Sequence, residues 1–242
     1  MLFSPLGILC GEKSVGLYSI STKIYNVGKN IFFAMTAVYV PRLSLLIQKK
    51  EFSVFSEKVH KFIMDILPLT IAAAVGIIGL GSELISLFAG LSYLEGVKSL
   101  HILAVAIVFA VLNGINTTII LIPLREEKLV LKATICSAVL HLMLNIILLP
   151  VYQQNGAAFT TLLAEILLFI ITTRRCYNYN IYKNLSKKII KNIIAIIPMI
   201  ICIILIFKVF IKNMFVRCMV STIVSIVWYI FIKMFMDKKV RQ

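Results

Sequence analysis

Charged residues are scarce in this 242-residue sequence: Asp, Glu, Lys and Arg together make up 14% of it, whereas the residues AVILMFWYC make up 60%. An average globular domain has about 25% charged and about 45–50% apolar residues. A soluble core cannot bury this much apolar surface at this length, so we expect lipid to be part of the solvent. The composition therefore excludes a soluble enzyme and a soluble nucleic-acid-binding module.

Cysteine and histidine patterns of metal or disulfide sites are also missing. The five cysteines are scattered without a CxxC, and the three histidines lie far apart. We therefore expect neither a zinc site nor a disulfide framework. The sequence also offers no Ser/His/Asp arrangement, no paired carboxylates and no phosphate-cradling glycine-rich loop. A non-enzymatic protein without a bound cofactor is the interpretation that this favours.

Long apolar runs are what the sequence does contain. A helix needs about 20 apolar residues to cross a bilayer, and a lone spanning segment must satisfy its own backbone hydrogen bonds. The sequence predicts an all-α, polytopic membrane helix bundle with about seven transmembrane helices. We place these spans near residues 16–43, 62–88, 97–122, 130–149, 156–173, 189–211 and 216–235. Residues 2–10 are too few to cross, have no basic segment before them, and are interpreted as the end of an incomplete span.

Positive charge is distributed unequally between the loops that these spans predict. If alternate loops share one side, that side collects 18 of the 25 Lys and Arg residues, and the opposite side collects five. Short loops rich in Lys and Arg stay in the cytoplasm. We therefore expect the N-terminus outside and the C-terminus in the cytoplasm. Most of the net charge of +15 is then explained by membrane topology, although the basic segment 174–191 could also contact anionic lipid.

Two lysines remain inside the first span and form part of a polar stripe. When the residues of this span are projected onto a helix that turns 100° per residue, six polar side chains fall within about a third of the circumference. They are Ser19, Thr22, Lys23, Asn26, Lys29 and Asn30. A lysine near the bilayer centre costs roughly 2.5–3.5 kcal/mol on insertion scales. We interpret the stripe as the wall of a hydrated cavity; the alternative is two lysines tolerated in a long interfacial helix.

Weaker polar lines occur in three later spans. Asn113 and Asn116 share a face of the third span, His141 and Asn145 are one turn apart in the fourth, and Glu165 lies in the fifth. Each of these lines could be a substrate site or a seam of hydrogen bonds between helices. Glu165 is the strongest single case, because a carboxylate inside a span is rare and is usually paired or protonatable. We name it as the candidate ion-coupling residue.

Two stretches resemble a known family. Val15-Gly16-Leu17-Tyr18-Ser19, followed by Val40-Pro41-Arg42-Leu43-Ser44, is similar to one motif of bacterial oligosaccharide (O-antigen or capsule repeat-unit) flippases. The run from Leu144 to Pro150, then Asn155-Gly156-Ala157-Ala158 and Leu163-Ala164-Glu165, is similar to a second motif. These flippases belong to the multidrug/oligosaccharidyl-lipid/polysaccharide exporter superfamily. Gln153-Gln154-Asn155 departs from the glycine-containing turn of that family, so we expect an altered turn there.

The resemblance implies a domain organisation. Such transporters have fourteen spans, in two six-helix lobes followed by two additional helices, and the seven spans here would be the eighth to the fourteenth. Residues 1–15 would then be the outer end of an incomplete span and a loop, and 16–175 the second-lobe bundle. Residues 176–188 would form a basic cytoplasmic loop, and 189–242 the two additional helices with a basic tail. A first lobe on another chain, or other polysaccharide-assembly proteins, would be the partners.

The resemblance also implies a function: flipping a lipid-linked oligosaccharide, carried on undecaprenyl pyrophosphate, across the bacterial cytoplasmic membrane by alternating access. Coupling to H⁺ or Na⁺ would drive it. The substrate would contact Lys23, Asn26, Lys29, Asn30, Asn113, Asn116, His141 and Asn145. Three alternatives stay open: a multidrug or cation antiporter of the same superfamily, a membrane polysaccharide polymerase or glycosyltransferase, and a non-functional fragment.

Overall fold

The computed structural model describes residues 5–179, 181 and 182, and this part of the chain is helical throughout, without a strand. The predicted spans 189–211 and 216–235, and most of the predicted basic loop 176–188, lie outside the described residues. The elements are α1 (Pro5–Gln48), α2 (Phe52–Gly79), α3 (Gly81–Ala89), the 3₁₀ helix η1 (Leu91–Gly96), α4 (Val97–Gly114), the π-helix η2 (Ile115–Leu121) and α5 (Glu127–Asn178).

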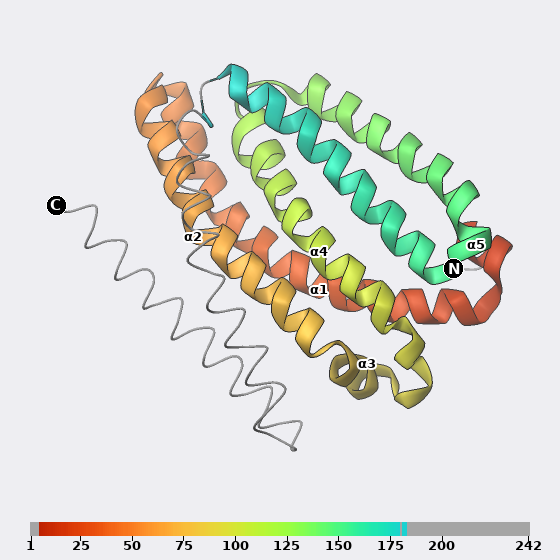
Figure 1. The fold of residues 1–242 in the computed structure, drawn as a ribbon. Helices are drawn as coiled ribbons and strands as arrows, with labels where there is room; N and C mark the ends of the chain where they lie inside the picture. The colour runs from red at the N-terminus through yellow and green to blue at the C-terminus, as the bar shows by residue number, and fades with distance from the viewer. Residues whose placement is uncertain (1–4, 180, 183–242) are drawn as a thin grey trace.

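Two of these helices are each interrupted at one residue. In α1, Gly11 has φ 79° and ψ 174°, a conformation that only glycine adopts without strain, and it separates residues 5–10 from 12–48. In α5, Gln153 has φ 48° and ψ −127° and separates the arms 127–152 and 154–178. Figure 1 shows the two arms lying side by side as a helical hairpin. The turn that the sequence predicts to be altered is therefore built around Gln153.

The helices reproduce the predicted spans in this part of the chain. Four helical segments are long and apolar enough to cross a membrane: Leu9–Gln48, Phe52–Gly79, Leu91–Leu121 and Glu127–Asn178. The last contains two of the predicted spans, because Gln153 divides it. The predicted span 62–88 needs correction: α2 begins at Phe52 and ends at Gly79, and the following residues form the separate short helix α3.

The core lies around α4, which contacts α1, α2 and α5. Leu103, Ala106, Ile107, Ala110 and Val111 of α4 are each at most 2% exposed. Small side chains let neighbouring helices approach closely, which is how helices associate in lipid. Gly114, at the end of α4, lies directly against the ring of Phe33 of α1. This packing holds α1 beside α4.

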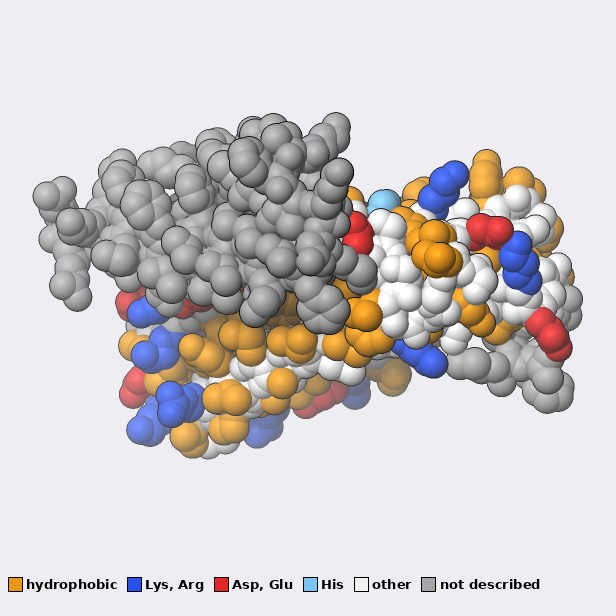
Figure 2. Space-filling view, turned by 90° about the horizontal axis from the view of Figure 1, so that it is seen from below, with side chains coloured by type: hydrophobic (Ala, Val, Ile, Leu, Met, Phe, Trp, Pro, Cys, Tyr) orange, Lys and Arg blue, Asp and Glu red, His pale blue; other side chains and the backbone are white. Residues whose placement is uncertain are grey.

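The outer surface of the bundle is apolar over much of its length. Large hydrophobic side chains are exposed on several helices, among them the first arm of α5, where Ile146 is 67% and Val151 70% exposed. Figure 2 shows hydrophobic side chains along the middle of one face and charged side chains gathered toward its two ends. Apolar side chains facing outward are stable only in lipid or against another protein. The described helices are those of a membrane protein.

The loops meet at two opposite ends of the bundle. At one end, Lys13 pairs with Glu95 at 2.9 Å, and Ser14 donates to Gln153 Oε1 at 3.2 Å. At the other end, the residues after η2 contact the end of α5, through the pair of Glu126 and Arg175. Figure 1 shows the α1–α2 connection at this second end. Alternate loops therefore share an end, as the predicted topology requires.

Candidate functional site

A cavity of about 350 Å³ lies between α1 and the two arms of α5. Its polar lining includes four residues that the sequence singled out as substrate-binding: Lys23, Asn26, His141 and Asn145. Apolar side chains complete the wall, and the full lining is Leu6, Val15, Tyr18, Ser19, Thr22, Lys23, Asn26, His141, Asn145, Leu149 and Ala157. Ligand sites commonly have volumes of about 300–1,000 Å³, an apolar wall and a few convergent polar groups.

The helical period of α1 explains how its polar stripe reaches this cavity. Leu17, Ser21, Tyr25 and Phe32 are buried and lie four or seven residues apart, so they form the face that packs on the bundle. The stripe with Ser19, Lys23 and Asn26 adjoins this face and is more exposed. Lys23 is exposed and so lies at the mouth of the cavity.

Hydrogen bonds tie the cavity wall together. Tyr18 Oη lies 3.0 Å from Thr161 Oγ1, which donates to the carbonyl of Ala157 at 2.9 Å. His141 Nε2 lies 3.4 Å from Thr161 Oγ1 and 3.4 Å from Asn145 Nδ2. Asn145 Oδ1 accepts from Thr160 Oγ1 at 2.7 Å. These contacts link α1 to both arms of α5.

Glu165 lies outside this lining, in a second polar centre. Tyr25 Oη donates to Glu165 Oε1 at 3.2 Å, and Asn113 Nδ2 donates to Oε2 at 2.7 Å. The same Asn113 amide also donates to the backbone carbonyl of Glu165 at 3.0 Å. The centre therefore joins α1, α4 and the second arm of α5. Among the described residues, Glu165 forms no ion pair.

The remaining stripe residues of α1 lie beyond the cavity. Lys29 is half-buried, and its Nζ lies 4.9 Å from the centre of the Tyr25 ring and 5.8 Å from that of Phe33. Such contacts stabilise an ammonium group where water is limited. Asn30 is exposed and does not line the cavity. The structure thus separates Lys29 and Asn30 from the cavity residues of the same helix.

Asn116 holds helices together and does not reach the cavity. Its side chain is fully buried, and its Nδ2 donates to Thr172 at 3.1 Å and to Thr173 at 2.9 Å. Its Oδ1 accepts from the Tyr182 hydroxyl. For this residue the structure favours the interhelical seam, the alternative to a substrate site that its sequence pattern left open. Asn113 is likewise outside the cavity and contacts Glu165.

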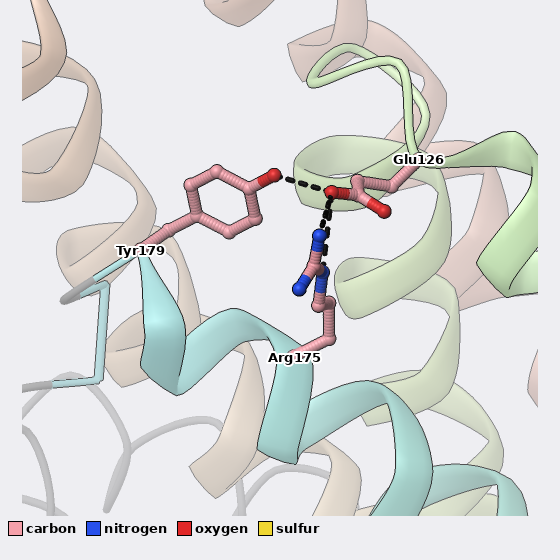
Figure 3. A network of polar contacts seen from close by, with 3 residues as sticks. All are labelled: Glu126, Arg175 and Tyr179. Carbon is pink, nitrogen blue, oxygen red and sulfur yellow. Dashed lines mark hydrogen bonds and ion pairs between the residues drawn. The ribbon is translucent and has the colours of Figure 1, made fainter.

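A further polar cluster lies at the end of the bundle that carries the η2–α5 connection (Figure 3). Both Arg175 Nε, at 3.1 Å, and Arg175 Nη2, at 2.5 Å, donate to Glu126 Oε1, and the Tyr179 hydroxyl donates to the same oxygen. The Arg175 guanidinium and then the Tyr179 hydroxyl hold the pKa of the Glu126 carboxyl below its ordinary value. The cluster fastens the start of α5 to its end.

Sequence reasoning missed the tyrosines of both polar centres. Tyr18 and Tyr25 are seven residues apart, so they lie on one face of α1, and each hydroxyl reaches the second arm of α5. That spacing was a usable signal, because a buried tyrosine normally hydrogen-bonds its hydroxyl. No group of three or more His, Cys, Asp or Glu side chains that could hold a metal ion occurs in the described part of the chain.

No protein-family model and no curated protein sequence matches this chain. Among solved structures, the chain is similar to the lipid II flippase MurJ in its inward closed conformation. The TM-score is 0.73 with 18% identity, and the match covers 95% of this chain and 48% of that one. The fold is MurJ-like. The chain spans about half the length of that structure, and at this identity the likeness describes the fold alone.

Proposed function

We propose that this protein takes part in flipping a lipid-linked oligosaccharide across the bacterial cytoplasmic membrane, for surface polysaccharide such as O-antigen or capsule. The observation that carries the proposal is the cavity between α1 and α5, where Lys23 and Asn26 face His141 and Asn145. The likeness to the MurJ fold and the two sequence motifs support a substrate carried on a polyprenyl lipid. Undecaprenyl pyrophosphate is the proposed carrier.

The chemistry of the cavity suits the head of such a lipid. A pyrophosphate loses hydration when it enters a partly apolar site, and a nearby ammonium group compensates for that loss. Lys23 supplies this charge, and Asn26, Asn145 and Thr22 supply polar groups that could contact phosphate or sugar. The polyprenyl tail would stay in the lipid along the apolar surface. Alternating access would then expose the head to either side.

The experiment replaces the two lysines of the α1 stripe. In cells whose surface polysaccharide depends on this protein, the double variant Lys23→Ala/Lys29→Ala should lose surface polysaccharide while still inserting into the membrane. The matched control is Lys58→Ala/Lys61→Ala, because these two lysines are exposed on α2. The control should leave the polysaccharide at the wild-type level. Wild-type polysaccharide from the Lys23→Ala/Lys29→Ala variant would contradict the proposed site.

A further inference from the structure

The centre around Glu165 is built from hydrogen-bond donors. Tyr25 Oη donates to one carboxylate oxygen and Asn113 Nδ2 to the other. Both donors are neutral, and Asn113 is only 4% exposed. A carboxylate inside a membrane span is costly without a cationic partner, and its presence indicates a function.

The donors point at the positions that a bound metal cation would need. A sodium ion in a transporter is coordinated by oxygen atoms, commonly backbone carbonyls of unwound helix. Here an O–H and an N–H face the two carboxylate oxygens, and the only non-helical backbone within α5 is at Gln153, three turns before Glu165. The surroundings of Glu165 therefore suit a carboxyl group that gains and loses a proton better than they suit a cation site.

Both protonation states can be satisfied by the same neighbours. With Glu165 ionised, both oxygens accept hydrogen bonds, as the structure shows. With Glu165 protonated, its new O–H needs an acceptor, and a tyrosine hydroxyl can accept as well as donate. Asn113 Oδ1 offers a second acceptor: it is buried and has no hydrogen-bond partner among the described residues. Rotation of the Asn113 amide would turn this oxygen toward the protonated carboxyl.

The charged and titratable groups around Glu165 come from α1 and the first arm of α5. From α1, Tyr25 contacts Glu165 directly, Lys29 lies over the Tyr25 ring, and Tyr18 contacts Thr161, one turn before Glu165. From the first arm, His141 contacts the same Thr161. From α4, Asn113 contacts Glu165. The titratable residues of α4, Lys98 and His101, lie near the opposite end of that helix, and η2 carries no titratable side chain.

We infer that Glu165 is the proton-exchanging site of this protein, and that H⁺, not Na⁺, is the ion coupled to movement of the anionic lipid head. This inference rests on the proposed function. The proton that Glu165 exchanges comes from water, converts the carboxylate to a carboxylic acid, and returns to water when the carboxyl ionises again.

The test reads the Glu165 carboxyl directly. Infrared difference spectra of the 242-residue chain in liposomes, recorded from acid to alkaline pH, should show the carbonyl band of a protonated carboxyl that titrates and is absent in Glu165→Gln. Adding Na⁺ should not move the midpoint. Glu57→Gln, at an exposed position of α2, is the matched control and should leave the Glu165 band unchanged.

The outcomes separate the proton site from the proposed function. A Glu165 band that does not titrate, or whose midpoint Na⁺ shifts, overturns the inference. Flipping of undecaprenyl pyrophosphate is measured in the same liposomes with and without a pH gradient. Flipping that ignores the gradient overturns the coupling to H⁺ and leaves the proposed function standing. A titrating, Na⁺-insensitive Glu165 band in liposomes without flipping supports the proton site and contradicts the proposed function.

Discussion

At Gln153 the backbone adopts φ 48° and ψ −127°, a conformation that residues other than glycine avoid. Residues held in such conformations cost of order 1–3 kcal/mol each. The Gln153 side chain offsets part of this cost by accepting a hydrogen bond from Ser14 Oγ at 3.2 Å. The strain lies where α5 reverses direction beside the cavity.

Comparing two substitutions isolates this backbone strain. Gln153→Gly and Gln153→Ala both lose the Ser14 hydrogen bond, but only glycine relieves the conformation. We expect Gln153→Gly to be more stable than Gln153→Ala by roughly 1–2 kcal/mol in unfolding measurements in detergent. Equal stability of the two variants would show that the backbone at Gln153 is not strained.

Glu126 predicts a pH dependence at the residue scale. Arg175 and then Tyr179 lower the pKa of the Glu126 carboxyl from its ordinary value of 4.5. A lowered pKa in the folded state contributes stability that is complete above pH 4.5 and is lost as the pH falls through the lower, folded value. The difference in unfolding temperature between wild type and Glu126→Gln should therefore be constant near neutral pH and shrink in acid. Arg175→Gln should weaken this acid dependence, with the remainder due to the Tyr179 hydrogen bond; an acid dependence as large as that of the wild type would assign the effect to another group.

At the scale of elements, the hairpin of α5 depends on close packing at Gly156. A Cβ at this position would lie 2.7 Å from the Leu148 carbonyl oxygen, which belongs to the backbone and cannot move aside. The two arms could not then keep their approach beside the cavity.

We expect Gly156→Ala to destabilise the protein by about 1–3 kcal/mol, as overpacking commonly does. Gly76→Ala in α2 is the matched control, because a Cβ there meets nothing within 4 Å. Alanine in a helix is favoured over glycine by up to about 1 kcal/mol, so the control should be neutral or more stable. Thermal unfolding of both variants in detergent checks this, and a Gly156→Ala variant as stable as the control would contradict the packing.

The existence of the helices could be predicted because apolar length alone signals a span, as α4 and the two arms of α5 confirm. The division between α2 and α3 was missed although Gly79 and Gly81 flank Leu80, because glycine is frequent inside transmembrane helices and the apolar residues continue to Phe88. Helical periodicity predicted that Lys23 and Asn26 share one face and that His141 and Asn145 share another. Nothing in the local sequence indicated that these two faces would line the same cavity. That pairing depends on tertiary packing.

At the scale of the whole molecule, alternate loops meet at opposite ends of the bundle. Lys50 lies in the α1–α2 connection and Glu95 in η1, near Lys13 at the other end. With the distribution of Lys and Arg, this predicts Lys50 in the cytoplasm and Glu95 outside.

Single cysteines at these positions test the topology. In a chain whose own cysteines are replaced by serine, Glu95→Cys should react with an impermeant maleimide added to intact cells. Lys50→Cys should react only after the membrane is opened. The reverse pattern would invert the orientation, and labelling of both in intact cells would contradict the placement of the two loops on opposite sides.

The central claim is that the cavity between α1 and α5 binds the charged head of a polyprenyl pyrophosphate. The most direct measurement is the affinity of undecaprenyl pyrophosphate for the protein in lipid nanodiscs, compared between wild type, Lys23→Ala and Lys58→Ala. A hydrogen bond to a charged group contributes about 1.5–3 kcal/mol, so Lys23→Ala should weaken binding roughly 10- to 100-fold, and Lys58→Ala should leave it unchanged. Binding by Lys23→Ala as tight as that of the wild type would contradict the claim.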